Sequence, residues 1–480
     1  MSEQQKSQVR KGDQLELTID SLAYGGRGVA RAGELVVFVK NAIPGQTVKA
    51  LIYRKKSGYA EARALEILKE SPQAVAPACA HFPLCGGCNA QQLDYAGQVD
   101  QKRQQVLDVF RRQAGLRDCE IAEVIPADPI YHYRNKMEFT ISALRWRTAD
   151  EPEPVRPDFA LGLHIPGRYD KILDIDECHI QPAVGNTLIS LVREVALANG
   201  LKAYDPKTHI GFLRHLALRF TDRGEQVMVN LVTAWENPDG LQPIVAALTE
   251  QIPQVVSIVN NVNTRQADVS YGEKEILLYG TPTITEHLNG LAFEISANSF
   301  FQTNTVQAEK LYAAALAGAA LSGQEVVYDL FCGTGSISLF LARQAREVHG
   351  FELIRSAVED ATRNALANRI TNVRFHAANL ETYFNASDIL KRLPAADVIV
   401  LDPPRAGISD KLARQLPRLG AKRIVYVSCN PTTQARDIAP LLEAGYRLDR
   451  LTLVDMFPHT PHIETVAVFT GPEGVAPSAD

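Results

Sequence analysis

The chain has 480 residues, 46% of them hydrophobic and 22% charged, with a formal net charge of −5 at pH 7. This composition is that of a globular protein with a large core, and the length allows two or three domains. No uncharged run approaches the roughly 18 residues of a membrane-spanning helix, and the polar N-terminus lacks the apolar segment of a secretion signal. We therefore expect a cytoplasmic protein without membrane contact, and we expect it to be a monomer.

The first 70 residues are basic, whereas the rest of the chain is acidic. They contain twelve Lys and Arg against eight Asp and Glu, a balance of +4 that leaves −9 for the other 410 residues. A basic module on an acidic body is typical of a domain that meets a polyanion, although a solvated basic surface would have the same composition.

Residues 12–68 alternate apolar and polar positions, broken by Gly-Gly and Pro-Gly turns. This pattern predicts short strands that close into a small β-barrel, which we place at residues 1–70. Such a barrel could bind a nucleic-acid backbone through six of its basic residues: Arg27, Arg31, Lys40, Arg54, Lys55 and Lys56.

The middle of the chain, residues 71–295, predicts an α+β domain. A loop with several prolines leads into an amphipathic helix at 95–115, and strand-like runs dominate from about 130 to 290. We expect basic residues of this domain to help hold a nucleic-acid backbone. The residues are Arg134, Lys136, Arg145 and Arg147.

From residue 296 to 480, apolar strands alternate with helical stretches, as in a doubly wound, Rossmann-like parallel sheet. Gly333 and Gly335 form a G-x-G loop between a strand and a helix, and Glu352 ends the next strand, where a carboxylate can accept both ribose hydroxyls. A nicotinamide dinucleotide would fit this pair too. Asp402 in "LDPPRAG" favours S-adenosylmethionine, whose sulfonium and ammonium are cationic, although an Asp there could also cap a helix.

Seven cysteines, an odd number, indicate metal ligation or catalysis rather than disulfides. Cys429 follows an apolar strand and precedes an Asn-Pro turn, where a ligand could reach it. Carbon 5 of uracil needs such a thiol, because it becomes nucleophilic only after a thiolate of lowered pKa adds to carbon 6. Glu464, at the start of an apolar strand, could remove the carbon-5 proton, with His459 and His462 as rivals.

Five segments together resemble the S-adenosylmethionine-dependent RNA 5-methyluridine methyltransferases: "DLFCGTGSISL", "FEL", "LDPPRAG", "VSCNPTT" and "DMFPHTPHIETVAVF". The resemblance covers the whole chain and implies that the N-terminal barrel is an OB-like, RNA-binding TRAM domain. It also implies that Cys429 is the nucleophile and Glu464 the base. The cofactor contacts that it implies are Gln302, Phe331, Ser336, Glu352, Asn379 and Asp402, with Ser336 standing where the family often has an asparagine.

The resemblance also gives a meaning to the cysteine cluster. Cys79, Cys85 and Cys88, together with the distant Cys178, are similar to the [4Fe–4S] site of the ribosomal RNA enzymes in this family. Thiolates of this kind suit zinc as well as an iron–sulfur cluster, and the unequal spacing and the family pattern favour the cluster. Cys119 and Cys332 are expected to be packing residues.

The resemblance implies RNA as the substrate, with 23S ribosomal RNA favoured over transfer RNA because TRAM and iron–sulfur features accompany 23S activity in the family. Two other functions remain open. One is methylation of an exocyclic amine, since "DPPR" resembles D-P-P-Y, but it leaves Cys429 and Glu464 without a role. The other is a non-catalytic RNA-binding protein built on the same fold.

Overall fold

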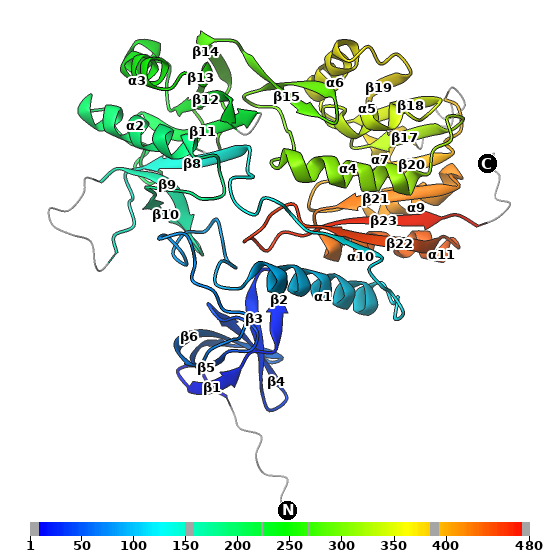
Figure 1. Ribbon diagram of the computed structural model, residues 1–480, viewed down its shortest axis with the longest axis horizontal. Coiled ribbons are helices and arrows are strands. Elements are labelled where there is room, and N and C mark those ends of the chain that lie inside the picture. Colours follow the sequence, from blue (N-terminus) through cyan, green and yellow to red (C-terminus); the bar gives the residue numbers. More distant parts are fainter. Residues whose placement is uncertain (1–8, 149–157, 222–223, 267–268, 385–392, 473–480) are drawn as a thin grey trace, which may run out of the picture. The chain divides into compact units, whose positions relative to one another are not determined.

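The computed structural model describes residues 9–148, 158–221, 224–266, 269–384 and 393–472 (Figure 1). The chain divides into two compact units. One consists of Met1–Val109 with Phe457–His462, and the other of Phe110–Met456 with Ile463–Asp480. Within the described ranges, no helix is both long and apolar enough to cross a membrane.

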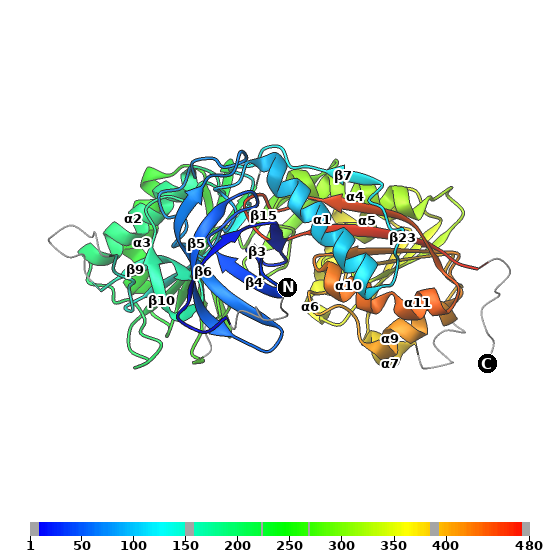
Figure 2. The ribbon, with the colours of Figure 1, turned by 90° about the horizontal axis from the view of Figure 1, so that it is seen from below.

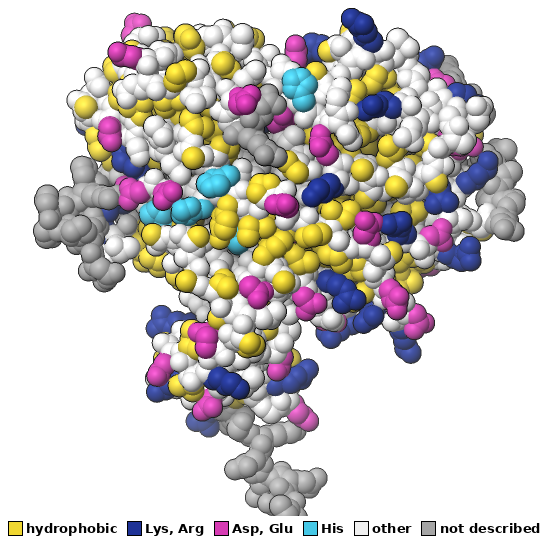
Figure 3. Space-filling view, in the orientation of Figure 1, with side chains coloured by type: hydrophobic (Ala, Val, Ile, Leu, Met, Phe, Trp, Pro, Cys, Tyr) yellow, Lys and Arg dark blue, Asp and Glu magenta, His cyan; other side chains and the backbone are white. Residues whose placement is uncertain are grey.

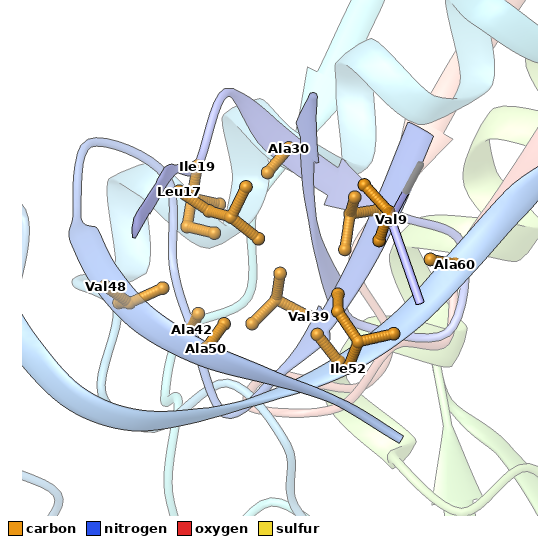
Figure 4. Close-up of a cluster of buried hydrophobic side chains, with 12 residues drawn as sticks. Val9, Leu17, Ile19, Ala30, Val39, Ala42, Val48, Ala50, Ile52 and Ala60 are labelled. Carbon is orange, nitrogen blue, oxygen red and sulfur yellow. The ribbon is translucent and has the colours of Figure 1, made fainter. Parts of the chain in front are cut away.

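The first unit contains a six-stranded sheet in the order β1-β5-β6-β4-β3-β2. Its alternating apolar side chains, among them Leu17, Val39 and Val48, point into one buried core (Figure 4). Gly25 and Gly26 adopt positive φ at the turn between β2 and β3, where other residues would be strained. The strands are β1 (Gln14–Thr18), β2 (Ser21–Ala23), β3 (Arg27–Ala32), β4 (Leu35–Lys40), β5 (Thr47–Lys55) and β6 (Tyr59–Lys69).

Helix α1 (Tyr95–Gln113) confirms the helix predicted at 95–115, and the division between the two units falls within it. Val106 and Phe110 are buried, as its apolar spacing predicts. The chain leaves the helix through Gly115, which has a positive φ, a common way for a helix to end.

The middle of the second unit is a seven-stranded sheet in the order β10-β9-β8-β11-β12-β13-β14. Its pairs are antiparallel except β12 with β13, which are parallel and joined through helix α3 (Pro238–Gln251). Helix α2 (Val184–Ala198) precedes β11. The strands are β8 (Lys136–Ser142), β9 (Ala160–Ile165), β10 (Arg168–Asp174), β11 (Leu213–Thr221), β12 (Gln226–Thr233), β13 (Val255–Val262) and β14 (Lys274–Gly280).

The C-terminal part of the second unit is an eight-stranded sheet in the order β19-β18-β17-β20-β21-β23-β22-β7. The first five strands in this order are parallel, as the alternation of strands and helices predicts, while β23 runs antiparallel to β21 and β22. The strands are β7 (Glu123–Ile125), β17 (Val326–Leu330), β18 (Glu347–Glu352), β19 (Val373–Ala377), β20 (Val398–Leu401), β21 (Arg423–Ser428), β22 (Arg447–Val454) and β23 (Glu464–Thr470).

A hairpin of β15 (Thr283–Leu288) and β16 (Leu291–Ser296) lies between the two sheets of this unit (Figure 1). Helix α4 covers one face of the C-terminal sheet, and α9 to α11 lie on the other (Figure 2). The helices are α4 (Thr305–Ala319), α5 (Ser336–Ala342), α6 (Arg355–Ala367), α7 (Leu380–Tyr383), α9 (Asp410–Gln415), α10 (Pro431–Asp437) and α11 (Ala439–Glu443), with a 3₁₀ turn at Leu416–Leu419.

The core of this sheet should dominate the stability of the second unit. Leu330 on β17 is fully buried, whereas Leu366 on α6 is 72% exposed. We expect Leu330→Ala to lower the free energy of unfolding by about 2–5 kcal/mol, because it leaves a cavity. Leu366→Ala, the matched control, should change it by less than about 0.5 kcal/mol. Urea unfolding of both variants measures this, and equal effects would contradict the placement of β17 at the centre.

Candidate active site

The turn after β17 leaves open space for a ligand beside the backbone. Phe331, Gly333 and Gly335 all have positive φ, so the chain bends sharply before α5 begins. A Cβ atom built on Gly333 would meet nothing within 4 Å, while one on Gly335 would meet the ring of Phe375 at 2.8 Å. The first glycine thus borders open space, and the second is needed for close packing.

Glu352 and Asn379 lie at the ends of the two neighbouring strands. Glu352 Oε2 accepts a hydrogen bond from Gly333 N at 3.2 Å, and its Oε1 accepts one from Ile354 N at 2.9 Å. Asn379 caps α7 through its side chain, and the preceding residue donates to the Glu352 carbonyl at 2.8 Å. The structure therefore brings the predicted ribose carboxylate against the glycine loop.

Tyr312 on α4 joins the other predicted cofactor residues. Its hydroxyl lies 3.2 Å from Ser336 Oγ and also makes a hydrogen bond with the Gln302 side chain. Burial raises the pKa of this phenol, and the negative charge of Asp402 raises it further, so Tyr312 is neutral. The sequence analysis missed Tyr312, because a tyrosine on an apolar helix face has the pattern of a core residue.

The segment that carries Gln302 is held by the middle sheet. The Arg219 guanidinium on β11, buried with 5% exposure, donates to the carbonyls of Ala297 and Ser299. Asn135 Nδ2 donates to the Gln302 carbonyl at 2.9 Å. Neither residue has a recognisable sequence signal, because the contacts join segments that are far apart in the chain.

Asp402 follows β20, and its backbone N–H donates to the carbonyl of Leu330 at 3.3 Å, beside the end of β17. Burial raises the pKa of this carboxyl to about 7. Asp329, on β17 itself, is also buried with a pKa raised to about 7, and it accepts a hydrogen bond from Ser338 Oγ. Buried carboxyls of this kind favour a bound cation, since a positive charge restores their ionised form.

Cys429 and Glu464 are neighbours because of strand register. β21 pairs with β23 so that Ser428 lies opposite Thr465, and Cys429 follows the first of these while Glu464 precedes the second. Gln434 fixes the pairing: its Oε1 accepts from Thr465 Oγ1 at 2.7 Å, and its Nε2 donates to a β21 carbonyl at 2.8 Å. The predicted nucleophile and the predicted base thus lie at the same end of adjacent strands.

The Cys429 turn is also tied to the Asp402 loop. Asn430 caps α10 with its side-chain oxygen, and its Nδ2 donates to the carbonyl of Arg405 at 3.1 Å. Thr433 Oγ1 donates to the same carbonyl at 3.3 Å. These bonds explain why "SCNPTT" and "DPPR", nearly 30 residues apart, act together in space.

The electrostatics of Cys429 correct one expectation. The uracil mechanism predicts a thiol of lowered pKa, but here burial, followed by the charges of Glu464 and Asp402, raises it to about 12. Burial and Asp402 also raise the pKa of Glu464 well above its usual range. In both cases Arg405 opposes the shift. The ligand-free site therefore holds a neutral thiol among carboxyl groups, with Arg405 as a cation that the sequence analysis did not single out.

The two rival histidines belong to the first unit. His459 has a positive φ, and Gln98 binds both its backbone N–H, at 2.8 Å, and its Nδ1 atom, at 3.2 Å. Its carbonyl accepts hydrogen bonds from two further backbone N–H groups, those of Asn89 and Ala90. These contacts give His459 a structural role in the first unit, which leaves Glu464 as the better candidate for the base.

The structure does not support the predicted metal site. Among the described residues, no group of three or more His, Cys, Asp or Glu side chains is arranged to hold a metal ion. Cys79, Cys85 and Cys88 lie in the loop before α1 of the first unit, and Cys178 precedes α2 in the second. As predicted for packing residues, Cys119 and Cys332 are buried.

The basic residues predicted to hold RNA differ in what they contact. In the middle domain, Arg145 is buried and Lys136 Nζ lies 2.5 Å from Glu138, so neither presents a free charge to phosphate. In the first unit, Lys40 and Lys56 lie over the rings of Tyr53 and Tyr59. Cations interleaved with aromatic rings suit single-stranded nucleic acid. Elsewhere, basic and acidic side chains are interspersed on the surface (Figure 3).

A parallel sheet with a glycine loop, a carboxylate at the end of the next strand and buried carboxyl groups is typical of an enzyme that binds a nucleoside cofactor. Comparison with known proteins makes this specific. The family model described as tRNA (Uracil-5-)-methyltransferase matches residues 269–470, and the TRAM domain model matches residues 8–65.

Curated relatives match over nearly their whole length. An uncharacterized RNA methyltransferase of Chlorobaculum tepidum is 41% identical over 97% of this chain and 98% of its own. Another, from Halalkalibacterium halodurans, is 37% identical over 98% of this chain and 99% of its own.

The tRNA (uracil-54, C5)-methyltransferase of Pyrococcus abyssi, solved with S-adenosyl-L-homocysteine, has a similar structure. The TM-score is 0.73 at 30% identity, covering 95% of this chain and 100% of that one. The chain belongs to the RNA uracil-5-methyltransferase family and is an S-adenosylmethionine-dependent methyltransferase with an N-terminal TRAM domain.

The raised pKa of Cys429 can be tested by alkylation. We expect iodoacetamide to modify it slowly at pH 7, with a rate that still rises at pH 10, because only the thiolate reacts. Glu464→Gln removes a charge that raises this pKa, so alkylation at pH 9 should be at least about threefold faster. Peptide mass spectrometry would follow Cys429, with Cys79 as an internal reference. A rate plateau below pH 9 in the wild-type protein would contradict the assignment.

Proposed function

We propose that this protein transfers a methyl group from S-adenosylmethionine to carbon 5 of a uridine in RNA, through a covalent bond between Cys429 Sγ and carbon 6 of the uracil. The observation that carries the proposal is the β21–β23 register, which puts a partly exposed thiol beside a buried carboxyl group. Methylation of an exocyclic amine would need neither group.

The cofactor residues of the proposal surround the turn after β17. Glu352 binds the ribose, Phe331 and Asn379 border the adenosine, and Asp402 faces the cationic end, with Gln302 and Ser336 placed through Tyr312. S-adenosylmethionine, when bound, supplies an electrophilic methyl group. Its positive charge near Asp402 would offset the negative charge that raises the pKa of Cys429, so the thiolate forms when the site is filled.

The chain's own residues then carry the remaining steps. The Cys429 thiolate adds to carbon 6, and the electron pair moves to make carbon 5 a nucleophile, which takes the methyl group. Glu464 accepts the proton from carbon 5, and the bond between Sγ and carbon 6 breaks to restore the aromatic ring and the thiolate. A raised pKa suits Glu464 to this step, because a carboxylate that ionises reluctantly is a stronger base.

A mechanism-based trap tests the covalent step. RNA that contains 5-fluorouridine cannot lose a proton at carbon 5, so the wild-type protein should remain covalently bound to it. Cys429→Ala should abolish the adduct and reduce methyl transfer at least about 10³-fold. Glu464→Gln should still form the adduct with ordinary RNA but release it slowly. Denaturing electrophoresis and transfer of labelled methyl groups measure both. Methylation of RNA by the wild-type protein without any trapping would refute the covalent route.

The RNA substrate is proposed to be 23S ribosomal RNA, on the sequence features named above, with transfer RNA as the alternative that the Pyrococcus abyssi enzyme represents. Cells that lack this protein should lose 5-methyluridine at one or more sites of 23S RNA, while transfer RNA keeps it. Mass-spectrometric mapping of both RNAs decides, and loss from transfer RNA alone would reverse the assignment. If the protein only binds RNA and has no catalytic activity, its loss will leave the 5-methyluridine content of both RNAs unchanged.

The sequence also predicts a [4Fe–4S] cluster on Cys79, Cys85, Cys88 and Cys178. The described residues show no such ligand group, and no step of the proposed reaction passes through a cluster. The proposal likewise takes the protein to act as a monomer.

A further inference from the structure

A cavity of about 220 Å³ lies in the second unit, outside the site described above. The loop before β8, the end of β11, the hairpin strand β15 and the first turns of α4 all contribute to its lining. The volume is several times the roughly 30 Å³ that one water molecule occupies in the liquid, so it can admit a small ring system. Tyr133 and Phe220 supply aromatic surface.

One wall of the cavity is shared with the cofactor segment. Asn135 lines the cavity, and its Nδ2 donates to the Gln302 carbonyl at 2.9 Å and to Thr305 Oγ1 at 2.8 Å. Thr305 in turn donates to Glu286 Oε2 at 2.8 Å. A ligand in the cavity would therefore lie against the residues that fix the backbone of Gln302.

Two acceptors of the lining can serve a ligand. Because both bonds of Asn135 use its amide nitrogen, its Oδ1 atom is left to accept. Both oxygens of Glu286 already accept hydrogen bonds, from His287 N and Thr305 Oγ1, whereas Glu309 accepts from Asn289 N through only one of its two oxygens. Such a lining repels phosphate and matches a ligand that offers N–H donors. It disfavours uracil, whose edge carries two carbonyl oxygens.

His132, a further lining residue, holds an uncommon backbone conformation, with φ at +56°. The strain is held in place by two bonds to the segment before α2: the His132 N–H donates to the His179 carbonyl at 2.9 Å, and Nδ1 donates to the Gln181 carbonyl at 2.8 Å. Residues kept in this region despite the cost are concentrated at ligand sites.

We propose that this cavity binds a second base of the RNA substrate, close in sequence to the target uridine, and that this base carries an exocyclic amino group, as adenine, cytosine and guanine do. The inference rests on the proposed function, since it assigns a specificity site to the same RNA. The second unit would then contribute to the choice of RNA sequence, and not only hold the RNA backbone.

The test is a binding selection with the full-length protein. A pool of RNA hairpins with a fixed loop uridine and randomised neighbours is bound in the presence of S-adenosyl-L-homocysteine, and the retained RNAs are sequenced. The wild-type protein should show one position, at a fixed offset from the uridine, where uridine is depleted about tenfold. Glu309→Gln replaces an acceptor by a donor of the same shape, so uridine should become tolerated there. Glu250→Gln, an exposed change on α3, is the matched control and should keep the wild-type preference.

A chemical substitution gives a second readout. If adenosine is preferred at that position, RNA with purine riboside there, which lacks only the amino group, should bind the wild-type protein about five- to tenfold more weakly. The Glu309→Gln variant should bind the two RNAs about equally well. No depleted position, or a depletion that Glu309→Gln leaves unchanged, would overturn the inference. Transfer of labelled methyl groups to the same pool tests the proposed function separately. Methylation without a base preference would refute binding of a second base in the cavity but not the proposed methyl transfer.

Discussion

The pairing of β21 with β23 is the constraint on which the chemistry of this protein depends. Because Ser428 lies opposite Thr465, Cys429, which follows β21, and Glu464, the first residue of β23, lie at one end of the sheet. A shift of one residue in this register would turn one of the two side chains to the other face. Gln434, a residue of α10, opposes that shift, because its side-chain amide makes hydrogen bonds with both strands.

In the ligand-free site, acidic side chains are buried close to one another. The carboxyl groups of Asp402 and Glu464 are buried near the thiol of Cys429, and Arg405 is the cation that opposes the shifts of Cys429 and Glu464. Burial raises the pKa of both carboxyl groups and of the thiol, so Cys429 is a neutral thiol in the ligand-free site. In the proposed mechanism, a sulfonium cofactor would supply positive charge together with the methyl group, and this would couple activation of the nucleophile to cofactor binding. The same acidity explains why a cationic cofactor suits this parallel sheet better than a dinucleotide.

The middle sheet does not only offer a surface for RNA; it also positions residues of the active site. Arg219 and Asn135 hold the backbone on either side of Phe300, and so they determine where Gln302 and Tyr312 meet. Not all of the basic residues that the sequence suggested for RNA binding are exposed, since Arg145 is buried. The buried Arg219 has a structural role, because its guanidinium donates to the carbonyls of Ala297 and Ser299.

The sequence by itself determined the small β-domain, helix α1, the parallel C-terminal sheet and the positions of Cys429, Glu464, Glu352 and Asp402 at strand ends, because periodicity and strand exits are local features. Tertiary structure decided the rest. Tyr312 joins the cofactor residues, and the distant strand β7 extends the C-terminal sheet, only through contacts across the fold. The pKa of the thiol also depends on charges brought together by folding, which local sequence patterns do not encode.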